Sequence, residues 1–177
     1  MFFYDFFNTK KEEKRSAKAV ANYFINLSKS TRVKISHLKL QKLVFFSHCW
    51  YLALKDDPLV EDEYAEAWEY GPVFPTIYHH FKHLGPLPIE NFAVDKTIDK
   101  NFNEQITMPV LPEDNYVFKV LNRIWEVYGD KSGGVLSELS HAEGSPWSET
   151  RRITKNKRNA NISNEVIKEI YKKRLDS

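Results

Sequence analysis

Apolar residues in the first part of the chain recur with the spacing of a helix. Ala17, Val20, Ala21 and Phe24 stand at positions i, i+3, i+4 and i+7, so they share one face. A stripe of this kind faces the core of a folded domain. The pattern predicts a first helix over residues 16–27.

The next helix is expected at the centre of the fold. It extends from Ser36 to Leu54, and Ser36 can cap its first turn while Ile35 packs against Leu40 across the cap. From residue 43 onward, the run LVFFSHCWYLAL is apolar on nearly every side. A helix without a polar face is buried by its neighbours, so we expect the other helices to surround this one.

Two stretches predict a small β element between residues 59 and 114. In EDEYAEAWEYGPV (residues 61–73) aromatic residues alternate with alanines, as in a strand, although the glutamates are equally compatible with a helix. The run ITMPVL (residues 106–111) fits a strand of a small hairpin, and its surroundings also fit a long surface loop. The sequence leaves both alternatives open.

A glycine and two prolines interrupt the helical pattern in the middle of the chain. Gly71 and Pro72 predict a corner, because proline lacks a backbone donor and clashes with a preceding helical turn. Pro75 suits the first position of a new helix, where the missing donor costs nothing, and Gly85 suits its end.

The best amphipathic pattern follows Asp114 and ends at Gly129. Its apolar stripe, which we expect to lie in the core, consists of Val117, Val120, Leu121, Ile124, Trp125 and Tyr128. The stretch GGVLSELSH then predicts a short helix that ends at Gly144.

Two further helices complete the prediction. Ser145 and Pro146 begin one, Ser163 caps the last, and the segment between them, RRITKNKRNAN, is a polar, basic linker. The sequence therefore predicts a mainly α fold, with a single compact helical domain around the central hydrophobic helix and a small β element.

The composition is that of an ordinary folded domain with many aromatic residues. The chain has 177 residues, of which 42% are hydrophobic, 28% charged and 14% aromatic, and we expect one domain over residues 16–175. A net charge of +2 does not by itself indicate nucleic acid or an anionic membrane. The single cysteine, Cys49, excludes an internal disulfide and fits the reducing cytoplasm, which is the expected location.

Residues 1–15 precede the expected domain and are interpreted as an aromatic N-terminal arm. Its apolar part is too short for a secretion signal, and charges follow it rather than precede it. No run approaches the ~18 apolar residues that a membrane helix needs, so no membrane partner is expected. The arm can contact a partner or dock on the domain's own core; we favour docking, because exposed aromatic clusters lower solubility.

Three blocks in order resemble the Panacea domain, also described as the SocA-like antitoxin domain. They are KLQKLVFFSHCWYLAL (residues 39–54), EAWEYGPVFPTIYHHF (66–81) and LSELSHAEGSPW (136–147). The ending ISNEVIKEIYKKRL is also similar to that of the family. The resemblance is specific as a set, because W-x-Y-G-P-V-x-P is followed some seventy residues later by a stretch like S/T-H-x-E-x-[SP]-P-W.

The resemblance implies an antitoxin that neutralises a cognate protein toxin by direct binding. Panacea domains are encoded beside a toxin gene, often on prophages or other mobile elements. One member instead acts as an adaptor that delivers its toxin to a protease, so a bacterial protease complex is the alternative partner. The family brings no established catalytic residues and no cofactor.

Two corners of the chain form the expected partner-binding surface, on the hypothesis that they meet in space. Tyrosine and tryptophan offer a large contact area at low entropic cost, and prolines order a loop before it binds. The candidate residues are Tyr70, Gly71, Pro72, Phe74, Pro75, His141, Glu143 and Trp147.

His141 and Glu143 also allow a different hypothesis, a hydrolase that uses them as an acid–base or metal pair. Two positions apart is poor helical spacing for one metal, and the chain has neither HExxH nor CxxC. A structural corner, in which Trp147 fills the core, is favoured. We therefore expect no catalytic residue and no metal.

The basic residues of the linker fit phosphate contacts, an acidic partner or a solvated loop, and the solvated loop is favoured. They are Arg151, Arg152, Lys155, Lys157 and Arg158. The segment lacks the interleaved aromatic residues on which bases stack. The residues before the first helix are too few for a helix-turn-helix, so nucleic acid is not an expected partner.

Overall fold

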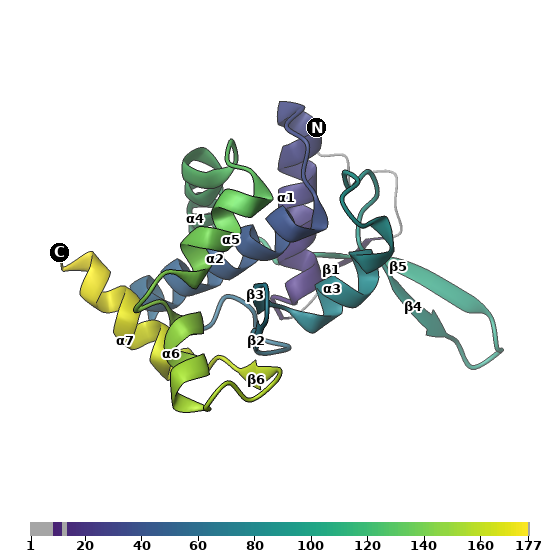
Figure 1. The fold of residues 1–177 in the computed structure, drawn as a ribbon. Helices are drawn as coiled ribbons and strands as arrows, with labels where there is room; N and C mark the ends of the chain where they lie inside the picture. Colours follow the sequence, from purple (N-terminus) through teal and green to yellow (C-terminus); the bar gives the residue numbers. More distant parts are fainter. Residues whose placement is uncertain (1–8, 12–13, 177) are drawn as a thin grey trace.

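The central helix α2 (His37–Lys55) confirms the position expected for the apolar run. The computed structural model describes residues 9–11 and 14–176. Other helices pack around α2 (Figure 1), and they are α1 (Ala17–Thr31), α4 (Asn115–Tyr128), α5 (Gly133–His141) and α7 (Asn164–Leu175). The core therefore forms around one almost entirely buried helix.

Side-chain caps fix most helix starts, which is why the boundaries follow the sequence closely. Ser36 Oγ accepts a hydrogen bond from Lys39 N at 3.3 Å, and Ser163 Oγ accepts one from Val166 N at 3.3 Å. The other capping residues are Ser16, Asp114, Ser132 and Ser145. Proline occupies the first position of α6 (Pro146–Ile153), after its Ser145 cap, and of α3 (Pro75–Phe81), which has no side-chain cap.

Two small sheets flank the helices. One has the order β3-β2-β6, from the antiparallel strands β2 (Glu66–Trp68), β3 (Gly71–Val73) and β6 (Ala160–Asn161). The other has the order β1-β5-β4, from β1 (Thr9–Lys11), β5 (Glu104–Val110) and β4 (Asp95–Ile98). The stretch at residues 61–73 is thus a strand pair rather than a helix.

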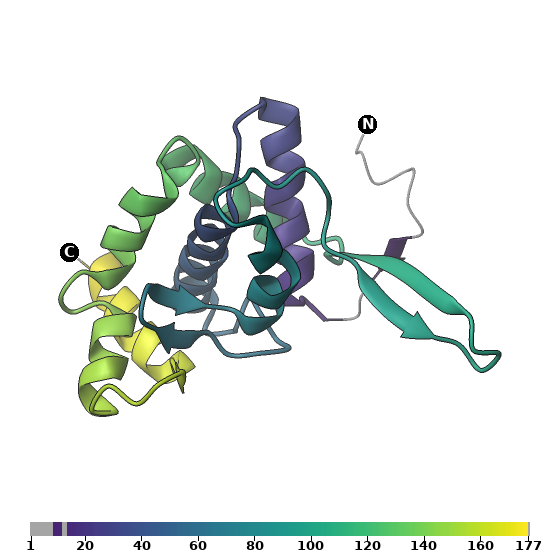
Figure 2. The same ribbon diagram turned by 45° about the vertical axis from the view of Figure 1, so that its right-hand side comes forward.

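The second alternative left open by the sequence is also decided. The run ITMPVL belongs to a hairpin of β4 and β5, which extends away from the body of the molecule (Figures 1 and 2). Its tip lies near Phe102, whose side chain is 91% exposed. The base of the hairpin is anchored by Met108, which is buried in the core.

The structure corrects three expectations. The segment 151–161 is not a plain linker, because its first residues end α6 and its last two form β6. Helix α5 ends before Gly144, with Ala142 as its C-terminal cap. Trp125 is half-buried rather than in the core, because it packs at the edge of α4 beside Phe24.

The architecture confirms a mainly α fold around a central hydrophobic helix, with small β elements. His48 is a hydrogen-bonded core residue: its Nδ1 accepts from Val60 N at 3.1 Å, and its Nε2 lies 3.0 Å from Asn164 Oδ1. Cys49 is buried. The phenylalanines of the N-terminal arm lie outside the described residues. Among the residues that the structure describes, no helix is both long and apolar enough to cross a membrane.

Candidate functional site

The corner between β2 and β3 is a tight turn that requires glycine. Glu69 and Tyr70 make the turn, and Gly71 pairs with Trp68 across the strands. Gly71 has φ +104°, a conformation that side chains with a Cβ rarely adopt. A Cβ on Gly71 would also approach the Nζ atom of Lys42 closely. Both backbone conformation and space therefore select glycine here.

Lys42 holds this corner from below. It is fully buried on α2, and its Nζ donates hydrogen bonds to the backbone oxygens of Tyr70 and Pro72, each at 3.0 Å. These partners are neutral carbonyls. Burial therefore lowers the pKa of Lys42 to about 7, because neutral carbonyls do not offset the cost of burying its positive charge.

Gln41, the neighbour of Lys42, holds the chain just beyond the corner. Its Oε1 accepts from Phe74 N at 2.9 Å, and its Nε2 donates to Phe74 O at 3.2 Å. Two polar side chains of the buried helix thus fix the segment 70–74. The sequence contains a signal for them, because the lysine and glutamine in KLQKL interrupt an otherwise apolar region.

The two corners expected to bind a partner do meet. Trp147 Nε1 donates to Trp68 O at 2.8 Å, and Ser137 Oγ donates to Tyr70 O at 3.2 Å. The His141 ring packs on the Trp147 ring with 4.3 Å between centroids. These contacts join segments of α5 and α6 to the turn of β2 and β3.

The candidate residues differ in accessibility. Tyr70 is 73% exposed and Glu143 is exposed, whereas Pro75, His141 and Trp147 are half-buried. The buried candidates are Gly71, Pro72 and Phe74. These three shape the corner and offer no surface to a partner, because the chain turns inward to α2 at this point.

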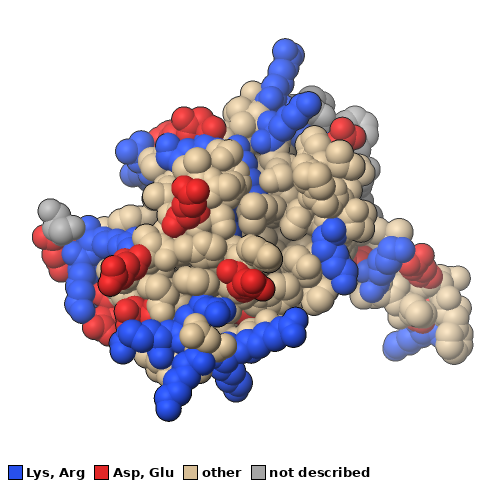
Figure 3. All heavy atoms as spheres, in the orientation of Figure 1, with Lys and Arg blue, Asp and Glu red and all other residues tan. Residues whose placement is uncertain are grey.

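A groove of about 1100 Å³ runs along the joined corners. Trp68, Tyr70 and Tyr78 contribute aromatic side chains to it, and Arg151 and Arg158 bring positive charge. Lysines and arginines gather at the lower edge of the molecule, over α6 and the segment that follows it (Figure 3). Of the five basic residues of that segment, only these two arginines line the groove.

Two histidines of the groove have polar atoms without partners. His37 Nδ1 and His141 Nε2 are buried and have no hydrogen-bond partner in the described part of the chain. Burial, and then the positive charges of Lys42 and Arg151, lower the pKa of His141 below its ordinary value. Among the described residues, no group of three potential ligands could hold a metal ion.

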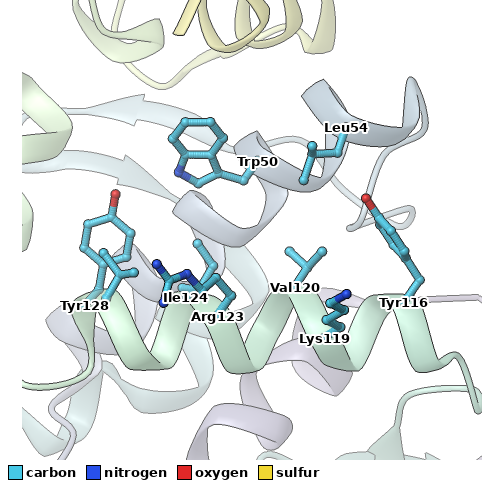
Figure 4. A pocket seen from close by; sticks show the side chains of 9 residues that line it. Trp50, Leu54, Tyr116, Lys119, Val120, Arg123, Ile124 and Tyr128 are labelled. Atoms are coloured by element: carbon cyan, nitrogen blue, oxygen red, sulfur yellow. The ribbon is translucent and has the colours of Figure 1, made fainter. Parts of the chain in front are cut away.

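A second concavity, of about 400 Å³, lies between α2 and α4 (Figure 4). Its walls are mostly apolar, with Trp50 and Leu54 from α2 facing Tyr116, Val120 and Ile124 from α4. Lys119 and Arg123 stand at its rim, and Arg123 is paired with Glu126 at 3.0 Å. This trough can receive apolar side chains and offers no acid–base pair.

Comparison with known families assigns the chain. Residues 40–148 match the family described as Antitoxin SocA-like, Panacea domain. The matched range contains both corners, the hairpin and most of α2. The chain belongs to this family, as its three motif blocks indicated.

A curated relative agrees with the assignment. The chain is 36% identical over 131 residues to the protein named Antitoxin SocA of Caulobacter vibrioides (strain NA1000 / CB15N). The alignment covers 74% of this chain and 68% of the relative. Comparison with the solved structures gave no match.

Proposed function

We propose that the protein is an antitoxin that neutralises a protein toxin by direct binding at the joined corners. Membership of the Antitoxin SocA-like family supports the role, as does the name of the curated relative. The hydrogen bond from Trp147 Nε1 to Trp68 O carries the choice of surface, because it joins two motif segments into one. Tyr70 projects from that surface and supplies an exposed aromatic anchor.

The mechanism is occlusion without chemistry. Lys42 and Ser137 hold the backbone of Tyr70, so the turn has little conformational freedom to lose when a partner binds. A rigid aromatic surface of this kind can cover or distort the toxin's active region. The partner is the product of an adjacent gene, and the complex forms in the cytoplasm.

The test is rescue of cells that express the neighbouring toxin gene. We expect Tyr70→Ala to abolish rescue and to weaken the purified complex at least tenfold, about 1.4 kcal/mol, as loss of an aromatic anchor does. Tyr64→Ala is the matched control, because Tyr64 is also exposed, at 53%, but does not line the groove. Unchanged melting temperatures would show that both variants are folded. Full rescue by Tyr70→Ala would refute this surface.

The same cells separate the two alternatives. An adaptor would lower the level of toxin, and that effect would disappear in a protease-deficient strain. A hydrolase using His141 and Glu143 would protect at far less than one antitoxin per toxin. Direct binding instead requires stoichiometric protein. Any loss of protection in Glu143→Gln should then be matched by a weaker complex.

A further inference from the structure

The groove combines cations and aromatic rings that lie far apart in the sequence. Arg151 and Arg158 come from the end of α6 and the segment after it, whereas Trp68 and Tyr78 come from β2 and α3. The basic segment has no aromatic residue of its own, which argued against base stacking. The fold supplies those aromatic residues from elsewhere.

The arginines of the groove lack carboxylate partners among the described residues. Arg151 Nε donates to Asn156 Oδ1 at 3.0 Å while its guanidinium lies over the Trp147 ring. Arg152, which does not line the groove, is instead paired with Glu149 at 2.7 Å. Unpaired cations in a concave site attract an anion.

The aromatic wall is fixed in orientation. Trp68 Nε1 donates to Glu66 Oε2 at 2.6 Å, and the Trp68 ring meets Tyr78 edge to face with 4.7 Å between centroids. An aromatic wall beside a cationic rim fits a planar heterocycle that bears an anionic group. A simple anion would gain nothing from the rings.

Several polar atoms in the groove can recognise the edge of a base. His37 Nδ1 and His141 Nε2 are the two partnerless buried atoms that belong to groove residues, and the side chains of Asn156 and Asn159 lie along the same groove. Bases present both donors and acceptors at their edges. Glu69 and Glu138 also line the groove, and their negative charge favours a ligand with few phosphates over a long polyanion.

We propose that the groove binds a nucleotide, with its phosphate at Arg151 and Arg158 and its base against Trp68 and Tyr78. The nucleotide is a free molecule or the end of a single strand. A groove of about 1100 Å³ has room for it, since ligand pockets usually measure roughly 300–1,000 Å³. Nucleotide binding goes beyond toxin neutralisation: the groove lies along the surface proposed for the toxin, but the binding requires no protein partner and can be tested without one.

The experiment uses the full chain alone. Tryptophan fluorescence and calorimetry would follow titration with AMP, ATP, GTP, inorganic pyrophosphate and a ten-nucleotide oligouridine RNA. We expect at least one nucleotide to bind about tenfold or more tightly than pyrophosphate, because only the nucleotides can stack. Oligouridine binding that is stronger than nucleotide binding, and that weakens as salt rises, would identify the ligand as the end of a single strand rather than a free nucleotide.

Variants locate the site. Arg151→Ala combined with Arg158→Ala should weaken nucleotide binding about tenfold or more, because both phosphate contacts are lost. Trp68→Leu should weaken nucleotides and leave pyrophosphate unchanged, while Trp68→Phe keeps an aromatic wall and most of the affinity. Arg123→Ala, an exposed arginine of α4, is the matched control and should bind like the wild type.

Three results would overturn the proposal. They are the absence of binding by every probe at millimolar concentration, equal affinity for pyrophosphate and nucleotides, and equal losses in the arginine double variant and Arg123→Ala. Preferential binding of a ten-residue oligoglutamate peptide would also overturn it, by assigning the groove to an acidic protein segment. Melting temperatures of all variants would ensure that a loss of binding is not a loss of fold. None of these outcomes bears on whether Tyr70→Ala rescues toxin-arrested cells.

Discussion

Gly71 and Phe102 are two of the residues with positive φ, and their turns place opposite demands on the side chain. Gly71, with φ +104°, lies in the corner between β2 and β3, where buried atoms surround it. Phe102, with φ +62°, lies at the tip of the β4–β5 hairpin and is almost fully exposed. The corner excludes even a methyl group, whereas the tip carries one of the largest side chains.

The difference follows from what holds each turn. Lys42 and Ser137 hold the corner through contacts distant in sequence. Local bonds hold the tip: Asp99 Oδ1 accepts from Asn101 N at 2.8 Å and from Asn103 N at 3.0 Å. Those backbone donors lower the pKa of Asp99 below its usual value. Changes at the corner should therefore reduce global stability, and changes at the tip should act locally.

The largest effect is expected for Gly71→Ala. The strained backbone costs about 1–3 kcal/mol and the overpacking about 1–3 kcal/mol more, because Lys42 can move aside only by giving up its hydrogen bonds. Gly144→Ala is the control, since Gly144 has φ +72° but open space around it, and it should lose about 1–2 kcal/mol. Urea unfolding measures the free energy of unfolding of both variants. Equal losses would show that close packing around Gly71 adds nothing to the cost.

A smaller effect is expected for Lys42→Met. The substitution leaves the carbonyls of Tyr70 and Pro72 without their donor, which should destabilise the protein by about 1–3 kcal/mol at pH 7. The release of a buried charge offsets part of that cost. A variant as stable as the wild type at pH 7 would contradict the role of Lys42 in holding the corner.

The pH dependence of stability identifies Lys42 more specifically. Its pKa is about 7 in the folded chain and 10.5 when unperturbed, so between these values the unfolded state binds more protons. Lys42 should therefore make wild-type stability rise from pH 7 to 9, by at most about 1.4 kcal/mol per unit, and Lys42→Met should show a clearly smaller rise, which the lowered pKa of Lys39 still causes. Above pH 9 the raised pKa of the Cys49 thiol acts in the opposite direction, which limits the useful range.

The contrast also explains what could be predicted from sequence. Helix starts were predictable because Ser36 and Ser163 cap within their own segments. The Gly71–Pro72 corner was predictable because proline fixes φ and breaks a helix, while glycine adopts conformations that other residues avoid. The meeting of the corners was only a hypothesis, since the contact between Trp147 and Trp68 depends on how α6 packs.

Other features could not be derived from local patterns. The apolar stripe placed Trp125 in the core, but helical spacing cannot show how far the core extends. β6 contains two residues whose pairing with β2 depends on the tertiary fold. The aromatic wall beside Arg151 and Arg158 could not be predicted for the same reason. Its residues, Trp68 and Tyr78, are far from the two arginines in the sequence and meet them only across the groove.

At the tip, Asp99→Ala should have a small and local effect. It removes the acceptor of two backbone N–H groups, and hydrogen exchange of the β4 and β5 amides should accelerate while the amides of α2 keep their protection. Asp99→Asn is the matched control, because its side-chain oxygen can still accept both bonds. Faster exchange throughout α2 would show that the hairpin and the core unfold together.

The smallest effect is expected for Phe102→Gly. The αL conformation costs an ordinary residue about 1–2 kcal/mol, which glycine recovers, while the freedom of glycine in the unfolded chain costs about 0.5–1 kcal/mol. Because the Phe102 ring is almost fully exposed, its removal forfeits little burial, and the net result should be a stabilisation of about 1 kcal/mol or less. Phe102→Ala, which keeps the backbone strain, should differ little from the wild type. Unfolding in urea would compare the three proteins, and a marked loss of stability in both variants would show that the ring packs against the molecule. Gly71→Ala and Phe102→Gly should thus change stability in opposite directions, because one introduces a side chain where none fits and the other removes one that the fold does not use.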